Sequence, residues 1–574
     1  MRESAQAIEW GSSVTTMTVA EAVGAELARL GVDTVFGVVG SGNFHVTNAL
    51  VAHGARFVAA RHEGGAATMA DAYARVSGTV GVLSVHQGPG LTNALTGITE
   101  AAKSRTPLLV LAADVGSAAV RSNFRVDQAA LARAVGAVSE RINSPAGALA
   151  DLRRAHRTAV ADRRTVLLSL PLDVQAAACP DPRPSTTGEP ARPPAPWPAA
   201  APPVPSPQGI AQLADALAAA RRPVFLAGRG ARLAAAREPL RALAERTGAL
   251  LATSAVARGL FHGDPFDLDV SGGFASPLAA DLIRGADLLV GWGCSLNMWT
   301  LRHGTLVGPA ATVAQVDLDG VALGAHRPVD IALVGDVAET ATAVADELAA
   351  RDFSTSGYRS AALADRLARE LRWRDVPYED DSDGERVDPR TLSIALDELL
   401  PAERTVAVDS GNFMGYPAMY LSVPDADGLV FTQAFQSIGL GLATAIGAAV
   451  ARPDRLTVAA LGDGGALMGV AELETAVRLG LGLLIVVYDD EAYGAEVHHF
   501  GPGGHPLETV VFPPAGIAEI GRGFGCAAIT VRRREDVAAA SEWLAGPRDR
   551  PLLIHAKVTT TRPAWWLEEA FRGH

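Results

Sequence analysis

Residues 456–500, LTVAALGDGGALMGVAELETAVRLGLGLLIVVYDDEAYGAEVHHF, decide the fold that we predict for this chain. The apolar run 456–461 predicts a buried strand, because it is short and stops at the glycine-rich turn 462–465. Apolar residues then recur at helical spacing over 467–477, and 483–488 is a second short apolar run that ends in acidic residues. This order of strand, helix and strand predicts a βαβ unit.

Two acidic residues, Asp463 and Asp490, come directly after the two predicted strands of this unit. Because the strands of a βαβ unit are parallel, their carboxyl ends lie at the same edge of the sheet and bring the two carboxylates together. Gly462, Gly464 and Gly465 let backbone N–H groups approach the same point, and the start of the following helix favours an anion there. Carboxylates and an anion share a site when a cation lies between them, and Mg²⁺ prefers such oxygen ligands. The stretch therefore predicts a site for a magnesium ion and a diphosphate.

The same stretch resembles the motif of thiamine diphosphate (ThDP) enzymes, which runs from G-D-G to N-N. The matching parts are 462–464, a helix, an apolar strand and the segment 489–494, DDEAYG. The resemblance implies that Asp463, Asp490 and the backbone carbonyl of Ala492 bind the metal. The residues that it places against the cofactor are Gly462, Asp463, Gly464, Gly465, Asp490 and Tyr493.

One position departs from that motif, since Asp490 stands where the family has asparagine. The extra charge near a diphosphate costs at most about 4 kcal/mol at a dielectric typical of a protein surface. Direct coordination to Mg²⁺ would offset much of this repulsion, so we expect the change to affect cofactor affinity. The alternative interpretation of the stretch is an ordinary strand, turn and helix with a solvated acidic turn.

The composition sets limits on the class of protein. The chain has 574 residues, 48% of them hydrophobic, a size that predicts three or four domains. A net charge of −13 and the lack of a basic block argue against nucleic acid or an anionic membrane as a partner. Three widely spaced cysteines, Cys179, Cys294 and Cys526, suit a reducing compartment. The first 13 residues lack the apolar core of a signal peptide, so we expect a cytoplasmic protein.

The N-terminal 180 residues repeat the order of helix, strand and glycine-rich turn. The expected strands are 35–39, 57–60, 80–85 and 108–112. This alternation predicts a doubly wound parallel sheet, whose ligands bind beyond the carboxyl ends of the strands. Ser41, Glu63 and Gln87 fall at such ends.

Glu63 is the strongest catalytic candidate of this domain. The sequence 62–66, HEGGA, resembles the setting of a glutamate that, in ThDP enzymes, hydrogen-bonds N1′ of the aminopyrimidine ring and promotes loss of the proton from the thiazolium carbon. The alternative is a glutamate that only stabilises its helix, an effect of a few tenths to about 1 kcal/mol.

A substrate region is predicted around the turn 88–93, GPGLTN, which resembles that of acetolactate synthase and its relatives. His86 and Gln87 precede this turn and either face the substrate or serve as hydrogen-bonded structural groups. Further candidates for substrate contacts are Ser41, Asn43, Phe124 and Arg125. Arg125 could meet a substrate carboxylate, and the alternative is a surface arginine.

The domain boundaries are predicted from composition. Twelve of the chain's 35 prolines lie between 180 and 208, which predicts an extended linker. The charged run 379–386, EDDSDGER, marks a second boundary. The predicted division is residues 1–180 for the pyrimidine-binding domain, 181–208 for a linker, 209–350 for a central α/β domain, 351–387 for a second linker and 388–574 for the diphosphate-binding and metal-binding domain.

The central domain gives little evidence of a ligand. Residues 228–230, GRG, come after a predicted strand, but the third glycine of a dinucleotide motif is missing, which favours a tight strand-to-helix turn. Acetolactate synthases carry FAD in the equivalent domain. The segment 291–297, GWGCSLN, resembles relatives that do not use FAD, so we do not expect FAD here.

The C-terminal domain carries further candidates outside its metal motif. In the family, a bulky aliphatic residue in the segment 435–441 props the cofactor into a V shape, and the resemblance assigns this role to Ile438 and a backbone contact to Gln436. His498 and His499 are candidate acid–base groups, because imidazole titrates near neutral pH. The apolar cluster at Trp565 is predicted to be either a lid or a tail that docks on the core.

The predicted fold is therefore α/β, with three doubly wound parallel-sheet domains. The resemblance covers nearly the whole chain and implies a homodimer or homotetramer, in which the first domain of one subunit and the third of another share ThDP and Mg²⁺. It implies a carboligase that acts on a 2-oxo acid and an aldehyde or ketone acceptor. The alternatives are a non-ligating 2-oxoacid decarboxylase or aldehyde lyase and, in another class, a non-catalytic cofactor-binding regulatory subunit.

Overall fold

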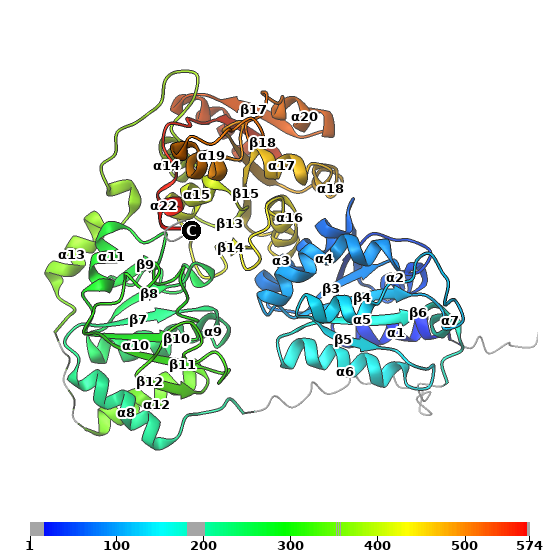
Figure 1. Cartoon of the computed structure of the whole chain (residues 1–574), viewed down its shortest axis with the longest axis horizontal. Coiled ribbons are helices and arrows are strands. Elements are labelled where there is room, and N and C mark those ends of the chain that lie inside the picture. Colours follow the sequence, from blue (N-terminus) through cyan, green and yellow to red (C-terminus); the bar gives the residue numbers. More distant parts are fainter. Residues whose placement is uncertain (1–16, 181–200, 352, 354, 356, 571–574) are drawn as a thin grey trace, which may run out of the picture. The chain divides into compact units, whose positions relative to one another are not determined.

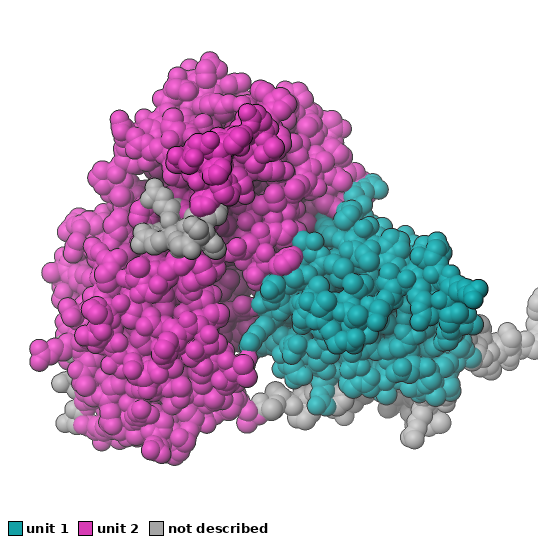
Figure 2. Space-filling model, viewed as in Figure 1, with its two compact units in different colours: residues 1–70, 79–197 teal, residues 71–78, 198–574 magenta. Residues whose placement is uncertain are grey.

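Three parallel six-stranded sheets with interleaved helices make up the protein (Figure 1), which confirms the predicted fold class. The structure is a computed structural model that describes residues 17–180, 201–351, 353, 355 and 357–570. Most of the predicted proline-rich linker 181–208 therefore lies outside the described residues. The chain divides into two compact units (Figure 2), Met1–Ala70 with Thr79–Trp197 and Asp71–Gly78 with Pro198–His574.

The N-terminal sheet has the strand order β2-β1-β3-β4-β6-β5. Its strands are β1 (Thr34–Gly37), β2 (Arg56–Ala59), β3 (Gly81–Val85), β4 (Leu108–Asp114), β5 (Val138–Arg141) and β6 (Thr165–Pro171). Its helices are α1 (Val19–Arg29), α2 (Phe44–Ala52), α3 (Glu63–Ser77), α4 (Pro89–Lys103), α5 (Gln128–Ala134), α6 (Ala148–Ala161) and α7 (Leu172–Ala176). Every residue of β3, β4 and β6 is buried, which explains why these strands are continuous apolar runs.

The central sheet has a different order, β12-β11-β10-β7-β8-β9, in which the first strand lies in the middle. Its strands are β7 (Pro223–Ala227), β8 (Leu250–Thr253), β9 (Asp267–Val270), β10 (Leu288–Trp292), β11 (Thr312–Asp317) and β12 (Ile331–Val334). Its helices are α8 (Pro207–Ala219), α9 (Arg229–Leu233), α10 (Arg237–Thr247), α11 (Pro277–Arg284), α12 (Val337–Ala350) and α13 (Ala361–Glu370).

Helices cover both faces of this central sheet. Phe225 belongs to the core that includes α8, α10 and α12, whereas its neighbour Val224 belongs to the core with α11. The segment 351–387, predicted as a linker, contains α13, whose Leu367 is buried in the second of these cores. Alternate residues of one strand therefore serve two cores, as a doubly wound sheet requires.

The C-terminal sheet, β14-β13-β15-β16-β18-β17, repeats the order of the N-terminal one when its strands are counted from the first. Its strands are β13 (Arg404–Val408), β14 (Leu429–Phe431), β15 (Leu456–Gly462), β16 (Leu483–Asp489), β17 (Ala527–Val531) and β18 (Leu552–Lys557). Its helices are α14 (Pro389–Leu399), α15 (Gly415–Tyr420), α16 (Gly441–Ala451), α17 (Asp463–Met468), α18 (Glu472–Arg478), α19 (Gly494–Phe500), α20 (Ile517–Phe524), α21 (Ser541–Ala545) and α22 (Trp565–Ala570).

The helix expected over 467–477 is in fact two helices, α17 and α18, so this prediction was wrong. Gly469 forms the C-cap of α17, and a Cβ at this position would lie 3.3 Å from the carbonyl oxygen of Gly439. A glycine and the close approach of another loop therefore end the helix, although the apolar spacing continues. Among the described residues, no helix is long and apolar enough to cross a membrane.

The C-terminal tail docks on the core of its own domain, which was one of the two predicted alternatives. The backbone N–H of Ala564 donates to Oδ1 of Asn412 at 3.0 Å, and the indole Nε1 of Trp566 donates to the Asn412 carbonyl at 2.9 Å. Gly415 leaves room for this indole, since a Cβ there would lie 2.2 Å from Cδ1 of Trp566.

Candidate functional site

Asp463 and Asp490 lie at one edge of the C-terminal sheet. The parallel strands β15 and β16 are neighbours, with Gly462 in register with Tyr488. Asp463 is the first residue of α17, and Asp490 comes directly after β16. Sheet pairing therefore brings the two acids together, as their place after adjacent strands requires.

Burial and proximity make this acid pair unfavourable without a cation. Burial raises the pKa of Asp463 to about 6, and the neighbouring Asp489 adds to the shift. Burial, followed by the charge of Asp463, raises the pKa of Asp490 well above its usual value. Asp463 is buried and Asp490 is half-buried, and a cation bound between two such carboxylates would stabilise both.

The donor set of the acid pair suits Mg²⁺. No group of three or more His, Cys, Asp and Glu that could hold a metal ion occurs in the part of the chain that the structure describes. Asp463, Asp490 and the Ala492 carbonyl could instead supply part of an octahedron, because Mg²⁺ commonly combines one or two carboxylates with phosphate oxygens and water.

The glycines around the acid pair are required by close packing. A Cβ on Gly494 would lie 2.2 Å from Oδ2 of Asp490, and a Cβ on Gly464 would lie 2.7 Å from Cε1 of Tyr493. Both distances are shorter than any side chain tolerates. The motif glycines thus let the acid and the aromatic ring approach the turn, which fits a site built around a small ligand.

A further acid, Asp409, is buried and ties two candidate cofactor loops together. Its carboxylate accepts the N–H groups of Ser410 at 2.8 Å, Gly439 at 3.1 Å and Leu440 at 3.3 Å. A Cβ on Gly465 would lie 2.4 Å from its Oδ2, so the same carboxylate also borders the glycine turn. Burial raises the pKa of Asp409 to about 6, against the effect of the donated N–H groups.

The loop that Asp409 holds carries the predicted residues Gln436 and Ile438. Gln436 has a φ of +60°, a left-handed conformation that non-glycine residues seldom adopt. Its side chain is exposed, and Ile438 is half-buried rather than part of the core. No role for Asp409 was predicted from the sequence, although its position at the end of β13 was the signal that could have found it.

Glu63 lies at the carboxyl edge of the N-terminal sheet, as the first residue of α3. It is half-buried, and its Oε2 accepts a hydrogen bond from Nδ2 of Asn93 at 3.0 Å. Gly90 borders the other carboxylate oxygen, since a Cβ there would lie 3.5 Å from Oε1. The predicted turn 88–93 and the predicted glutamate are therefore neighbours, and the carboxylate could accept a bond from a ligand.

Four other predicted residues gather beside the same edge. His86 Nδ1 interacts with the Gln87 carbonyl at 2.8 Å, its Nε2 lies 3.4 Å from Oγ of Ser41, and its ring packs edge-on against Phe124. Gln87 is buried, and its side-chain oxygen has no hydrogen-bond partner among the described residues. A buried acceptor without a partner is costly, which fits a group that binds a ligand.

The remaining candidates have other surroundings. Asn43 is fully buried, and its amide bonds the backbone of Gly40 and the hydroxyl of Ser84 within the domain. Arg125 is exposed. His498 and His499 lie on α19 and are half-buried, and burial lowers the pKa of His498. The structure thus gives Asn43 internal partners and puts the two histidines on the helix after the acidic segment.

Three family models match the chain in this order. They are "Thiamine pyrophosphate enzyme, N-terminal TPP binding domain" over residues 17–132, "Thiamine pyrophosphate enzyme, central domain" over 210–344 and "Thiamine pyrophosphate enzyme, C-terminal TPP binding domain" over 409–556. Each match falls on one of the three sheets.

Individual proteins are similar over nearly the full length. A probable 2-ketoarginine decarboxylase of Pseudomonas aeruginosa is 32% identical, with 91% of this chain and 90% of that protein covered. A sulfoacetaldehyde acetyltransferase of Rhodobacter capsulatus is 30% identical, with 84% and 83% covered. The large subunit of acetolactate synthase isozyme 2 of Escherichia coli is 27% identical, with 94% and 95% covered.

Proposed function

Because this chain belongs to the thiamine pyrophosphate enzyme family, we propose that it uses ThDP and Mg²⁺ to cleave and form carbon–carbon bonds at the carbonyl of a 2-oxo acid. The observation that carries the proposal is the acid pair Asp463 and Asp490 at the end of two adjacent strands, where burial raises both pKa values and favours a bound cation. Bound ThDP supplies an electron sink for the carbon that loses or gains the bond.

The residues of the chain then have separate tasks. Asp463, Asp490 and the Ala492 carbonyl would hold Mg²⁺, and the loop of Gln436 and Ile438 would support the cofactor between its two rings. Glu63 would hold a proton at the pyrimidine nitrogen. We further propose a homodimer or homotetramer, in which Glu63 of one subunit serves the diphosphate site of another.

The leading reaction is transfer to an acceptor carbonyl, as in a carboligase. Relatives named acetolactate synthase and sulfoacetaldehyde acetyltransferase support it, and a relative named 2-ketoarginine decarboxylase supports simple decarboxylation as the second candidate. Purified enzyme with Mg²⁺ and ThDP should be given pyruvate, longer 2-oxo acids and 5-guanidino-2-oxopentanoate, each with and without an aldehyde. Mass spectrometry then distinguishes a ligated product from a free aldehyde.

The role of Glu63 is tested by Glu63→Gln. We expect hydrogen–deuterium exchange at the thiazolium carbon of bound ThDP to slow by roughly 10²- to 10⁴-fold, because the variant cannot share the proton at the ring nitrogen. Calorimetry serves as the control and should give ThDP binding close to that of the wild type. Exchange at the wild-type rate would contradict the proposal and favour a cofactor-binding protein without catalysis.

A further inference from the structure

Strand β16 ends in the first of three consecutive acids, Asp489, Asp490 and Glu491. Two of these acids have cationic partners. Asp489 is buried and accepts hydrogen bonds from His555 Nε2 and Lys557 Nζ, both at 2.6 Å. Lys557 also donates to Glu491 at 2.9 Å. His555 and Lys557 thus contact the first and third acids, and the charge of Asp490 is available to a ligand.

Glu491 combines this pairing with an unusual backbone. Its φ is +58°, in the left-handed region that costs an L residue energy and favours glycine. Lys557 Nζ contacts its Oε1 at 2.9 Å, and Arg386 Nη2 contacts its Oε2 at 2.6 Å. Lys557 is buried, and Glu491 and Arg386 are half-buried, so the two ion pairs are partly shielded from water and restrain the side chain.

The turn that Glu491 forms lies between two proposed metal ligands, Asp490 and Ala492. The backbone of Glu491 makes two hydrogen bonds here. Its carbonyl accepts the N–H of Phe512 at 2.8 Å, and its N–H donates to Oδ1 of Asp489 at 3.0 Å. A change of φ at residue 491 would rotate the Ala492 carbonyl relative to the Asp490 carboxylate. The Ala492 carbonyl is therefore oriented by this strained residue on one side and by the bridge of Ala492 to Val511 on the other.

Arg386 reaches Glu491 because the segment that carries it runs beside β18. The N–H of Val387 donates to the Lys557 carbonyl at 2.9 Å, and the N–H of Thr559 donates to the Val387 carbonyl at 3.1 Å. Arg386 Nη1 also donates to the Val558 carbonyl at 3.1 Å. This pairing brings the two cations to the same end of the sheet, although they lie far apart in the sequence.

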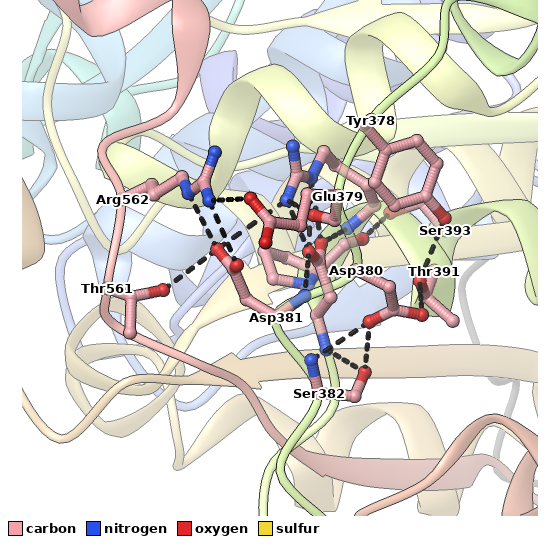
Figure 3. A network of polar contacts seen from close by, with 12 residues as sticks. Tyr378, Glu379, Asp380, Asp381, Ser382, Thr391, Ser393, Thr561 and Arg562 are labelled. Atoms are coloured by element: carbon pink, nitrogen blue, oxygen red, sulfur yellow. Dashed lines mark hydrogen bonds and ion pairs between the residues drawn. The ribbon is translucent and has the colours of Figure 1, made fainter.

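The acidic run that we predicted to be a domain boundary anchors this segment. Arg562 contacts Asp381 at 2.9 Å, and Thr561 donates to the same carboxylate at 3.0 Å. Thr391, near the start of α14, donates to Asp380 at 2.7 Å. Figure 3 shows these bonds between the run, the start of α14 and the C-terminal tail. The network holds the segment on both sides and so fixes the approach of Arg386.

We propose that Glu491 is a positioning residue, whose carboxylate is held by Lys557 and Arg386 so that the left-handed turn presents Asp490 and the Ala492 carbonyl to Mg²⁺. The inference rests on the proposed function, since it needs Mg²⁺ at the acid pair. It predicts that the site weakens when no ion pair holds the strained turn, and that it weakens much less when the residue at 491 adopts a positive φ without strain.

Glu491→Ala and Glu491→Gly test this prediction, because both remove the ion pairs but only glycine adopts a positive φ without strain. Alanine loses the ion pairs and keeps the strain, so the Mg²⁺ concentration that half-saturates ThDP binding should rise by about tenfold, the size of effect seen for residues that orient metal ligands. Glycine loses the ion pairs but adopts a positive φ freely, so we expect a rise of at most about threefold. Calorimetric titration of each full-length protein with ThDP at several Mg²⁺ concentrations measures both.

Arg386→Gln removes one of the two ion pairs and should raise the half-saturating Mg²⁺ concentration by about threefold, since Lys557 remains. Arg534→Gln is the matched control, because Arg534 pairs with Glu398 at the same 2.6 Å in a more exposed place. It should leave the Mg²⁺ titration unchanged. Thermal unfolding of the metal-free proteins shows whether each variant is folded at the temperature of titration.

Three results would overturn the inference. Titrations of Glu491→Ala that match the wild type would show that the ion pairs do not position the ligands. Equal weakening of the alanine and glycine variants would show that the carboxylate acts through its charge and not through the turn. If wild-type protein bound ThDP without any dependence on Mg²⁺, the proposed metal site itself would fail and the inference with it.

Discussion

The N-terminal and C-terminal sheets share one strand order, but they carry different residues at the end of the third strand. In the N-terminal sheet, β3 leads to His86 and Gln87, which are neutral or weakly basic. In the C-terminal sheet, β15 leads to Asp463, beside a second acid at the end of β16. One backbone topology therefore carries either an imidazole and an amide or an acid pair after its third strand, and the residues at the strand ends decide which.

The second strands differ as well. In the N-terminal sheet, three residues separate β2 from Glu63 and its helix α3. In the C-terminal sheet, β14 leads into a loop of nine residues before α16, and Asp409 holds that loop through its N–H groups. The carboxylate of Glu63 accepts a side-chain amide in the first case, and the carboxylate of Asp409 accepts backbone N–H groups in the second. A catalytic acid cannot be recognised from its position in the fold alone.

The largest expected effect is on cofactor binding, and it distinguishes the residues that follow the third strands, Asp463 after β15 and His86 after β3. Asp463→Ala should weaken Mg²⁺-dependent ThDP binding by at least about 100-fold, because it removes a proposed metal ligand and leaves Asp490 alone, and even residues that only orient metal ligands contribute 10- to 100-fold. Calorimetry with and without Mg²⁺ gives the value. His86→Ala, at the matched position of the N-terminal sheet, should retain the Mg²⁺ dependence. An equal loss of Mg²⁺-dependent ThDP binding in both variants would contradict the proposal that only the C-terminal sheet holds the metal.

Local patterns were sufficient to predict the three sheets and the convergence of Asp463 with Asp490. Short apolar runs, glycine turns and the parallel arrangement of βαβ units are encoded within a few tens of residues. The break between α17 and α18 was not predictable in this way, since it depends on contact with Gly439.

The partners of Asp489, Glu491 and Asp409 could not be predicted from local sequence patterns either. Lys557 lies 68 residues after Asp489 and Arg386 lies 105 before Glu491, so that only the pairing of β16, β18 and the segment beside it brings them together. The tie between Asp409 and Gly439 spans 30 residues and two loops of irregular shape. Such contacts depend on sheet register, which no motif in this sequence specifies.

A smaller effect is expected from the difference between the first strands of the two sheets. In the C-terminal sheet β13 is followed by Asp409, whereas in the N-terminal sheet β1 ends at Gly37 without an acid. Burial raises the pKa of Asp409 to about 6, compared with about 4 in an unfolded chain. The folded protein thus binds this proton more tightly, so the contribution of Asp409 to stability falls as pH rises from about 4 to 6.

Asp409→Asn removes that titration. Relative to wild type, the variant should gain on the order of 2–3 kcal/mol of unfolding free energy between pH 4 and pH 7. Urea unfolding of both proteins at four pH values in this range measures the difference. A difference that does not change with pH would show that the carboxyl group is not perturbed by burial and that the three N–H bonds fully compensate for it.

The smallest effect separates the two acids of the C-terminal sheet from each other. Asp490→Asn keeps an oxygen ligand and removes a charge from a pair whose burial and mutual repulsion raise the pKa of Asp490. We expect Mg²⁺-dependent ThDP binding to be unchanged or up to about threefold tighter, since the lost attraction to Mg²⁺ and the lost repulsion of the diphosphate nearly cancel at the effective dielectric of a protein. Calorimetry under the conditions used for Asp463→Ala makes the comparison direct. Complete loss of binding would show that the second carboxylate is needed for its charge, and both proposed metal ligands would then have to be carboxylates.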